Sequence, residues 1–145
     1  MPVMSLDSLT LEECFSLLHD ADLGRVVYTE RALPACTPVR FALDGHTVVF
    51  LVDSGSRLAV ATDHTVVAFQ ADYVHPETGF GWTVLVTGDA KPITRFSDQL
   101  RASRLHLSRA DAELNTEHWV QLTPGIVTGR RLQPSQSSQV DRTRD

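Results

Sequence analysis

Cysteine is scarce in this sequence, which has 145 residues and only two cysteines, Cys14 and Cys36. Two cysteines this isolated exclude a disulfide framework and a structural zinc site. No Ser-His-Asp or Cys-His arrangement marks a catalytic centre either, so we assign no catalytic residue and no metal site from the sequence. Because free thiols persist in reducing compartments, we expect a cytoplasmic protein.

Positive charge and long apolar runs are also missing. Thirteen Lys and Arg against 18 Asp and Glu give a formal net charge of −5, whereas non-specific nucleic-acid binding requires a basic face. No apolar run approaches the roughly 18 residues that cross a bilayer, and no signal peptide is visible at the N-terminus. We therefore expect a single globular domain that binds neither nucleic acid nor membrane.

A helix is indicated near the N-terminus. Thr10 and Glu13 have the T-x-x-E spacing of a capping box, in which each side chain bonds a free backbone N–H at the helix start. Gly24 is predicted to end the helix. The apolar residues between them recur at helical spacing and form one stripe, with Cys14 as a small core residue: Leu11, Cys14, Phe15, Leu17, Leu18 and Ala21.

Beyond Gly24 the pattern changes to that of β-strands. Asp44-Gly45 is a two-residue hairpin signal, and Thr123-Pro124-Gly125 predicts a second hairpin turn. A polar stretch from Ser97 to Glu113 is predicted to be helical. The predicted strands are Arg25–Thr29, Ala35–Leu43, His46–Val52, Thr65–Tyr73, Trp82–Lys91, His118–Leu122 and Ile126–Leu132.

Six or seven strands with few helices in so short a chain favour an antiparallel barrel or sandwich, and closure into a barrel removes exposed edges. Pro38 lies inside the second predicted strand and has no N–H to donate, so its position should be at a sheet edge or a bulge. We predict a mainly β domain over residues 1–132. Residues 133–145 have almost no apolar side chains and are predicted to be a disordered tail.

One segment has the composition of a phosphate site. Ser54, Gly55, Ser56 and Arg57 follow an apolar strand and precede the short apolar run from Leu58. Hydroxyls, free backbone N–H groups at a helix start and a guanidinium suit a phosphate. The alternative is structural: Ser54 or Ser56 caps a short helix, and Arg57 is a solvated surface charge.

The order and spacing of several short motifs resemble the pyridoxamine 5'-phosphate oxidase-like flavin-binding split-barrel family, in its small actinobacterial-type branch. The resemblance runs from about residue 8 to 132. It implies a six-stranded antiparallel split β-barrel with an N-terminal helix and one or two short helices, and a homodimer that holds FMN between its subunits. The residues that carry it are Leu23–Tyr28, Pro34-Ala35, Pro38–Gly45, Val48–Phe50, Gly55–Leu58, Val66–Phe69, Gly81–Gly88, His118–Val120 and Val127–Leu132.

The resemblance also implies a cofactor site. Pro38, Val39, Arg40 and Phe41 would line the isoalloxazine ring; Ser54, Ser56 and Arg57 would lie near the phosphate. Trp82 and Trp119, from later strands, would close the site of the partner subunit. Each has a plainer alternative: Arg40 as a surface charge, and the two tryptophans as core or interface packing.

The function implied is an oxidoreductase that transfers hydride between bound flavin and a small organic substrate. Two alternatives stay open: a deazaflavin-dependent reductase, and a non-enzymatic flavin carrier. Arg131-Leu132-Gln133-Pro134 fits the R-L-x-P substrate segment of the larger oxidases. Four residues do not identify vitamin B6 as the substrate, and none is assigned.

Overall fold

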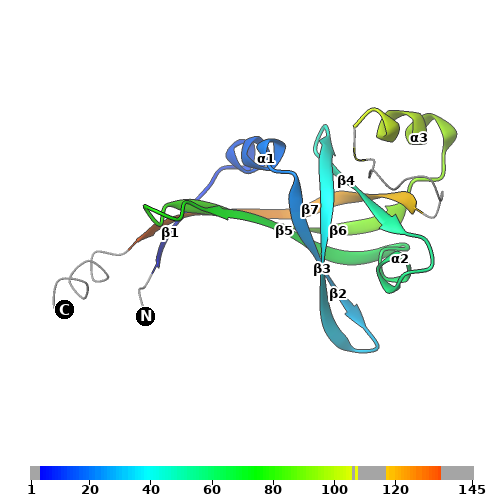
Figure 1. The fold of residues 1–145 in the computed structure, drawn as a ribbon, viewed down its shortest axis with the longest axis horizontal. Coiled ribbons are helices and arrows are strands. Elements are labelled where there is room, and N and C mark those ends of the chain that lie inside the picture. The colour runs from blue at the N-terminus through cyan, green and yellow to red at the C-terminus, as the bar shows by residue number, and fades with distance from the viewer. Residues whose placement is uncertain (1–3, 106, 108–116, 135–145) are drawn as a thin grey trace.

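The computed structural model describes residues 4–105, 107 and 117–134, and within them seven strands and three helices. Figure 1 shows their arrangement. In chain order the elements are β1 (Met4–Ser8), α1 (Leu11–Asp20), β2 (Leu23–Glu30), β3 (Leu33–Asp44), β4 (Thr47–Asp53), α2 (Arg57–Ala61), β5 (Thr65–Val74), β6 (Gly81–Pro92), α3 (Phe96–Ser103) and β7 (Glu117–Pro134).

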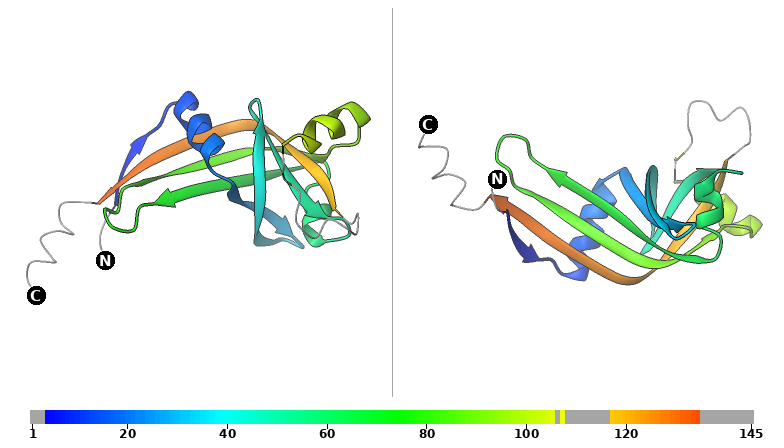
Figure 2. Two further views of the ribbon diagram at one scale, coloured as in Figure 1. Left: turned by 45° about the horizontal axis from the view of Figure 1, so that its top comes forward. Right: turned by 90° about the horizontal axis from the view of Figure 1, so that it is seen from below.

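The strands form one antiparallel sheet that closes on itself. Its order is β1-β7-β4-β3-β2-β5-β6, and β6 pairs again with β7. Strands β2 to β7 therefore make a closed ring of six, which confirms the predicted split barrel with an N-terminal helix and two short helices. The short β1 is an addition that the sequence did not predict, and it pairs with the end of β7. The views in Figure 2 show β5, β6 and β7 continuing beyond the ring as a long curved arm.

The core lies inside the ring, and alternate residues of each strand point into it. Phe41, Phe50 and Phe69 are among its largest fully buried side chains. The helix α1 packs against β7 so closely that a Cβ on Gly129 would lie 2.5 Å from the Cys14 Sγ. Burial raises the pKa of the Cys14 thiol, with the nearby Glu13 carboxylate adding to the effect. Cys14 is thus a core residue, as predicted.

The start of α1 follows the prediction and its end does not. The Thr10 side chain accepts from the Glu13 N–H, and the Glu13 carboxylate accepts from the Thr10 N–H at 3.0 Å. The helix ends at Asp20, with Ala21 as its C-cap, whereas Gly24 lies inside β2. A Cβ at Gly24 would meet the Phe69 ring at 2.2 Å, so this glycine serves close packing and not helix termination.

The predicted hairpin at residues 123–125 is wrong, because β7 runs unbroken from Glu117 to Pro134. Its pairing with β6 shifts by one residue, from Thr87↔Ile126 to Gly88↔Pro124, which leaves Gly125 as the extra residue of a β-bulge. A Cβ on Gly88 would lie 2.0 Å from the Thr123 carbonyl oxygen. The small residues therefore let the two strands stay paired through the bulge.

Two other boundaries differ from prediction. Strand β7 includes Gln133 and Pro134, which pair with β1, so the strand extends two residues into the predicted tail. The predicted helix from Ser97 to Glu113 begins as α3, at Phe96–Ser103. Residues 135–145, and most of the predicted helix beyond 105, lie outside the described residues. No helix in the described part of the chain is long and apolar enough to span a bilayer.

Candidate functional site

The main groove lies where two neighbouring strands part. β3 and β4 pair only from Asp44↔Thr47 to Phe41↔Phe50, and beyond that pair they diverge around α2. The gap forms an open groove of about 500 Å³. Its walls come from Thr37 to Arg40 of β3, Leu51 to Asp53 of β4 and Ser56 to Leu58 at the start of α2. Tyr28 of β2 also lines it.

The groove brings together five of the nine predicted cofactor residues: Pro38, Val39, Arg40, Ser56 and Arg57. They come from two segments some 16 residues apart in the sequence. The groove also contains residues that the sequence did not single out, chiefly Leu51, Val52 and Asp53. These residues line the groove because β3–β4 pairing stops beside them, and no local sequence pattern predicts where this pairing stops.

Pro38 occupies the sheet edge that its missing N–H requires. The Phe41 N–H donates to the Asp22 carbonyl next to β2 at 3.2 Å. Because strand residues alternate in direction, the Pro38 nitrogen and carbonyl then point away from β2 and toward the groove. β4 is not paired with β3 at this level, so the prediction of an edge position is confirmed.

Phe41, by contrast, is part of the core. Its side chain is buried and packs edge-on against Phe69, with the ring centroids 4.7 Å apart. Phe41 follows the last residue of β3 that lines the groove, and it is absent from the groove lining. The four-residue stretch predicted to contact the cofactor therefore contributes three residues to the groove.

The turn into α2 supports the structural alternative for its serines. Gly55 has φ of +85° and lies in a turn closed by the Ser56 N–H donating to the Asp53 carbonyl at 3.0 Å. The Ser56 hydroxyl accepts from the Ala59 N–H at 3.1 Å and caps the helix. The Ser54 hydroxyl is bonded to the His118 Nδ1 at 2.9 Å and does not line the groove.

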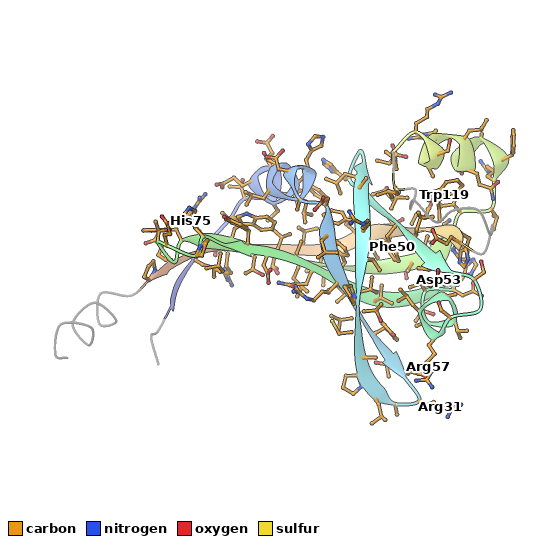
Figure 3. All side chains as sticks on the ribbon, viewed as in Figure 1. Arg31, Phe50, Asp53, Arg57, His75 and Trp119 are labelled. Atoms are coloured by element: carbon orange, nitrogen blue, oxygen red, sulfur yellow. The ribbon has the colours of Figure 1, made fainter. Side chains whose placement is uncertain are left out.

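Arg57 is a surface cation at the rim of the groove. Its side chain is 82% exposed and its Nε lies 3.3 Å from the Glu30 Oε1. Figure 3 shows Arg57 directed toward the tip of the β2–β3 hairpin, which Arg31 marks, while Asp53 lies nearer the ring. Arg40, also exposed, lines the same groove. Two guanidinium groups thus border a groove whose walls are largely apolar, an arrangement suited to a flat organic ligand with an anionic end.

The two tryptophans lie elsewhere on the chain. Trp119 packs against a second apolar cluster that includes Val49, Ile93 and Leu107, on the face of the sheet covered by α3. Trp82 is half-buried and borders a different cavity with Tyr73. Neither lines the groove of its own chain, and their predicted contribution to a partner's site stays a prediction.

One further polar pair lies in the groove. The Tyr28 hydroxyl and the Thr37 hydroxyl are hydrogen-bonded at 2.9 Å, and both residues line the groove. In the described residues no group of three or more His, Cys, Asp or Glu side chains could hold a metal ion.

Comparisons with known proteins agree with this architecture. A family model described as pyridoxamine 5'-phosphate oxidase matches residues 10–131. An uncharacterized protein of Mycobacterium tuberculosis is 33% identical over 129 residues, which cover 86% of this chain and 84% of that protein. The solved FAD binding protein of Mycobacterium smegmatis has a TM-score of 0.76 at 33% identity, over 86% of this chain and 98% of that one. An FAD-binding protein of Mesorhizobium loti shares the fold, with a TM-score of 0.72 at 16% identity over 90% and 98% of the two chains.

Proposed function

Because the chain belongs to the pyridoxamine 5'-phosphate oxidase family, we propose that it binds a flavin nucleotide in the groove between β3 and β4. We further propose that it acts as an oxidoreductase on a small organic substrate. The observation that carries the first proposal is the groove itself, which lies between two strand edges that are not paired with each other and has two arginines at its rim.

The groove fits the shape and chemistry of a flavin ring. Its volume of about 500 Å³ is in the range of small-molecule sites. Val39, Leu51 and Leu58 give it apolar walls for a flat ring. Next to these walls, β3 before Phe41 and β4 after Phe50 are not paired with each other. Backbone N–H and C=O groups at such edges can pair with the nitrogen and oxygen atoms along one edge of an isoalloxazine.

The phosphate end would lie beside Arg57. Its present partner, Glu30, is itself a surface carboxylate, with 30% of its side chain exposed. A phosphate can replace Glu30 because an exposed ion pair contributes little and a phosphate offers more acceptor oxygens. Since Ser56 already caps α2, we assign the anchoring of the phosphate to Arg57, and we place Arg40 on the opposite side of the groove as a second cation.

The identity of the nucleotide has two leading candidates. The family resemblance of the sequence favours FMN, and the 33% identical relative from M. smegmatis is described as binding FAD. A deazaflavin is the third possibility, since it shares the flat ring and the phosphate. When bound, a flavin supplies the hydride and electron transfer; the protein supplies an oriented, apolar environment that keeps water off one face of the ring.

We propose that the protein is a homodimer. The outer face of the sheet has exposed apolar side chains on four neighbouring strands: Val27 on β2, Val66 on β5, Leu85 on β6 and Ile126 on β7. The pairing register places Val27, Ala68, Thr87 and Ile126 in one row across the sheet. Several exposed apolar side chains on one face of a sheet are typical of an interface between chains, and a second copy of this chain would cover them.

The experiment that tests the function begins with the purified protein. A bound flavin gives visible absorption, and mass spectrometry of the chromophore released by heat distinguishes FMN, FAD and deazaflavin. A colourless protein that also fails to bind added FMN, FAD or deazaflavin would overturn the binding proposal. Retained flavin without turnover on any of a panel of electron donors and acceptors would overturn the oxidoreductase proposal alone and favour a flavin carrier.

A further inference from the structure

A second cavity opens at another point where strands part. β2 and β5 pair only from Val27↔Ala68 to Arg25↔Gln70, whereas β5 stays paired with β6 as far as Val74↔Gly81. The start of β2 therefore separates from the β5–β6 arm. In this gap, at the C-terminal end of α1, lies a cavity of about 500 Å³. Leu23 is the one described residue that borders both this cavity and the flavin groove.

The cavity has one aromatic wall. Tyr73 of β5 and Trp82 of β6 are direct cross-strand partners, and both line the cavity. Tyr73 is 52% exposed, so a ligand can reach its ring. Leu17, Ala21 and Leu23 supply apolar surface beside this pair. An open cavity with aromatic and aliphatic sides suits ligands that carry carbon better than a bare metal ion.

Another part of the lining is negatively charged. Asp20 and Asp22 line the cavity at the point where α1 ends, and the partial negative charge of the helix C-terminus adds to their field. A third carboxylate, Asp72, accepts a hydrogen bond from Gln70 at 2.8 Å and lies 3.8 Å from Arg25, whose positive charge offsets its own.

No cation of the cavity lining is paired with Asp20 and Asp22. The exposed His19, outside the lining, lies 3.7 Å from Asp20 and balances its charge only when the imidazole is protonated. Arg25, the cation in the lining, is bonded to Gln70 at 3.3 Å and close to Asp72. The lining therefore combines an aromatic pair with two carboxylates that no cation of the lining neutralises.

We propose that this cavity binds a small organic cation, of the alkylammonium or quaternary ammonium class. The positive head would lie between the carboxylates and the faces of Tyr73 and Trp82, where aromatic rings attract cations. Its alkyl groups would pack on Leu17 and Leu23. A neutral molecule of the same shape gains only the apolar contact, and an anion is repelled. Among the described residues of one chain this site shares Leu23 alone with the flavin groove, and its occupancy does not depend on the proposed redox function.

Choline is a suitable probe, and 3,3-dimethyl-1-butanol is its neutral isostere. Saturation-transfer proton NMR on the full-length protein, with whatever flavin it retains, measures the binding of both compounds at millimolar concentration. We expect choline to bind at least several-fold more tightly than the isostere, and added salt to weaken choline alone. The flavin absorption of the same sample shows independently whether the groove is intact.

Two variants assign the binding to this cavity. Asp22→Asn and Tyr73→Leu should each raise the choline Kd about two- to fivefold, the size expected for an exposed cation–π or ion contact. Asp63→Asn and Phe80→Leu are the matched controls: the first makes the same change as Asp22→Asn, and the second also replaces an exposed aromatic ring with leucine, both at residues outside the cavity lining. Equal binding of choline and its isostere, absence of binding by both, or equal effects of test and control variants would each overturn the proposal.

Discussion

Replacing Arg57 with alanine tests whether this arginine anchors the phosphate of the flavin. In the flavin-bound protein we expect Arg57 to release Glu30 and bond the phosphate. Arg57→Ala removes that bond and leaves the apolar walls and strand edges of the groove intact. Because the side chain is 82% exposed and makes one surface ion pair, its loss should change the free energy of unfolding by less than about 1 kcal/mol.

The size of the binding defect follows from the surroundings of Arg57. A hydrogen bond to a charged group contributes about 1.5–3 kcal/mol. Since Arg57 is exposed to solvent and must give up Glu30, we expect the lower end, about 1.5 kcal/mol, or roughly a tenfold higher Kd for FMN. Riboflavin has no phosphate, so its Kd should not change. Glu30→Gln should act in the opposite sense and tighten FMN binding a few-fold.

Fluorescence titration of the flavin-free protein with FMN, FAD and riboflavin measures these effects. Arg101→Ala is the control: Arg101 is another exposed arginine in an ion pair, bonded to Asp44 at 2.8 Å, and it lies on α3, outside the groove lining. Equal losses for FMN and riboflavin would mean that the variant damaged the groove. Unchanged FMN binding, with the melting temperature preserved, would refute Arg57 as the anchor.

Three further outcomes test other parts of the structure. Ala32 has φ of +65° in the β2–β3 turn, so Ala32→Gly should raise the free energy of unfolding in urea by about 1 kcal/mol; a decrease would contradict this. The pKa of Glu13 is lowered, first by its hydrogen bonds with Thr10 and then by Arg131, so the charged carboxylate stabilises the fold above pH 4.5 and this contribution is lost as the pH falls through the lower folded-state pKa. The Glu13→Gln variant should therefore have a lower melting temperature than the native protein at neutral pH, and this difference should become smaller in acid. A difference that does not change with pH would refute the proposed effect of Glu13 ionisation on stability. Ile126→Glu, on the exposed sheet face, should yield a folded monomer by light scattering and reduce flavin retention, and an unchanged dimer would exclude that face as the interface.

Local signals in the sequence predicted the parts of the fold that depend on neighbouring residues. The capping box of Thr10 and Glu13 forms as expected, because both partners lie within one helical turn. The hairpin at Asp44-Gly45 is likewise correct, with Gly45 at φ of +62°. Gly24 was misinterpreted because its role depends on Phe69, more than forty residues away, whose ring occupies the space of a Cβ.

The candidate site likewise depends partly on local sequence signals and partly on contacts distant in sequence. Alternation along β3 distinguishes inward from outward residues, but Val39 and Phe41 point the same way and only one lines the groove. The difference arises because β4 pairs with Phe41 and has already diverged at Val39. Leu51 and Asp53 were missed for the same reason, since the end of β3–β4 pairing depends on contacts distant in sequence. Ser56 and Arg57 were identified because their segment has a recognisable composition, although the serine hydroxyl proves to cap α2.

The pairing of the eighteen-residue strand β7 affects how the chain can fold during synthesis. It pairs with β4 through Glu117–Leu122, with β6 through Val120–Leu132 and with β1 through Arg130–Pro134. All three partners precede it in the chain, and β1 lies more than a hundred residues earlier. On the ribosome, β4 therefore has no neighbour on the side away from β3 until residues 117–122 emerge, and the wall of the groove that β4 forms is incomplete until then. A cofactor therefore cannot bind to a complete groove and assist folding before β7 has been synthesised. We expect it to enter after synthesis, and the many long-range strand pairings to make barrel closure slow.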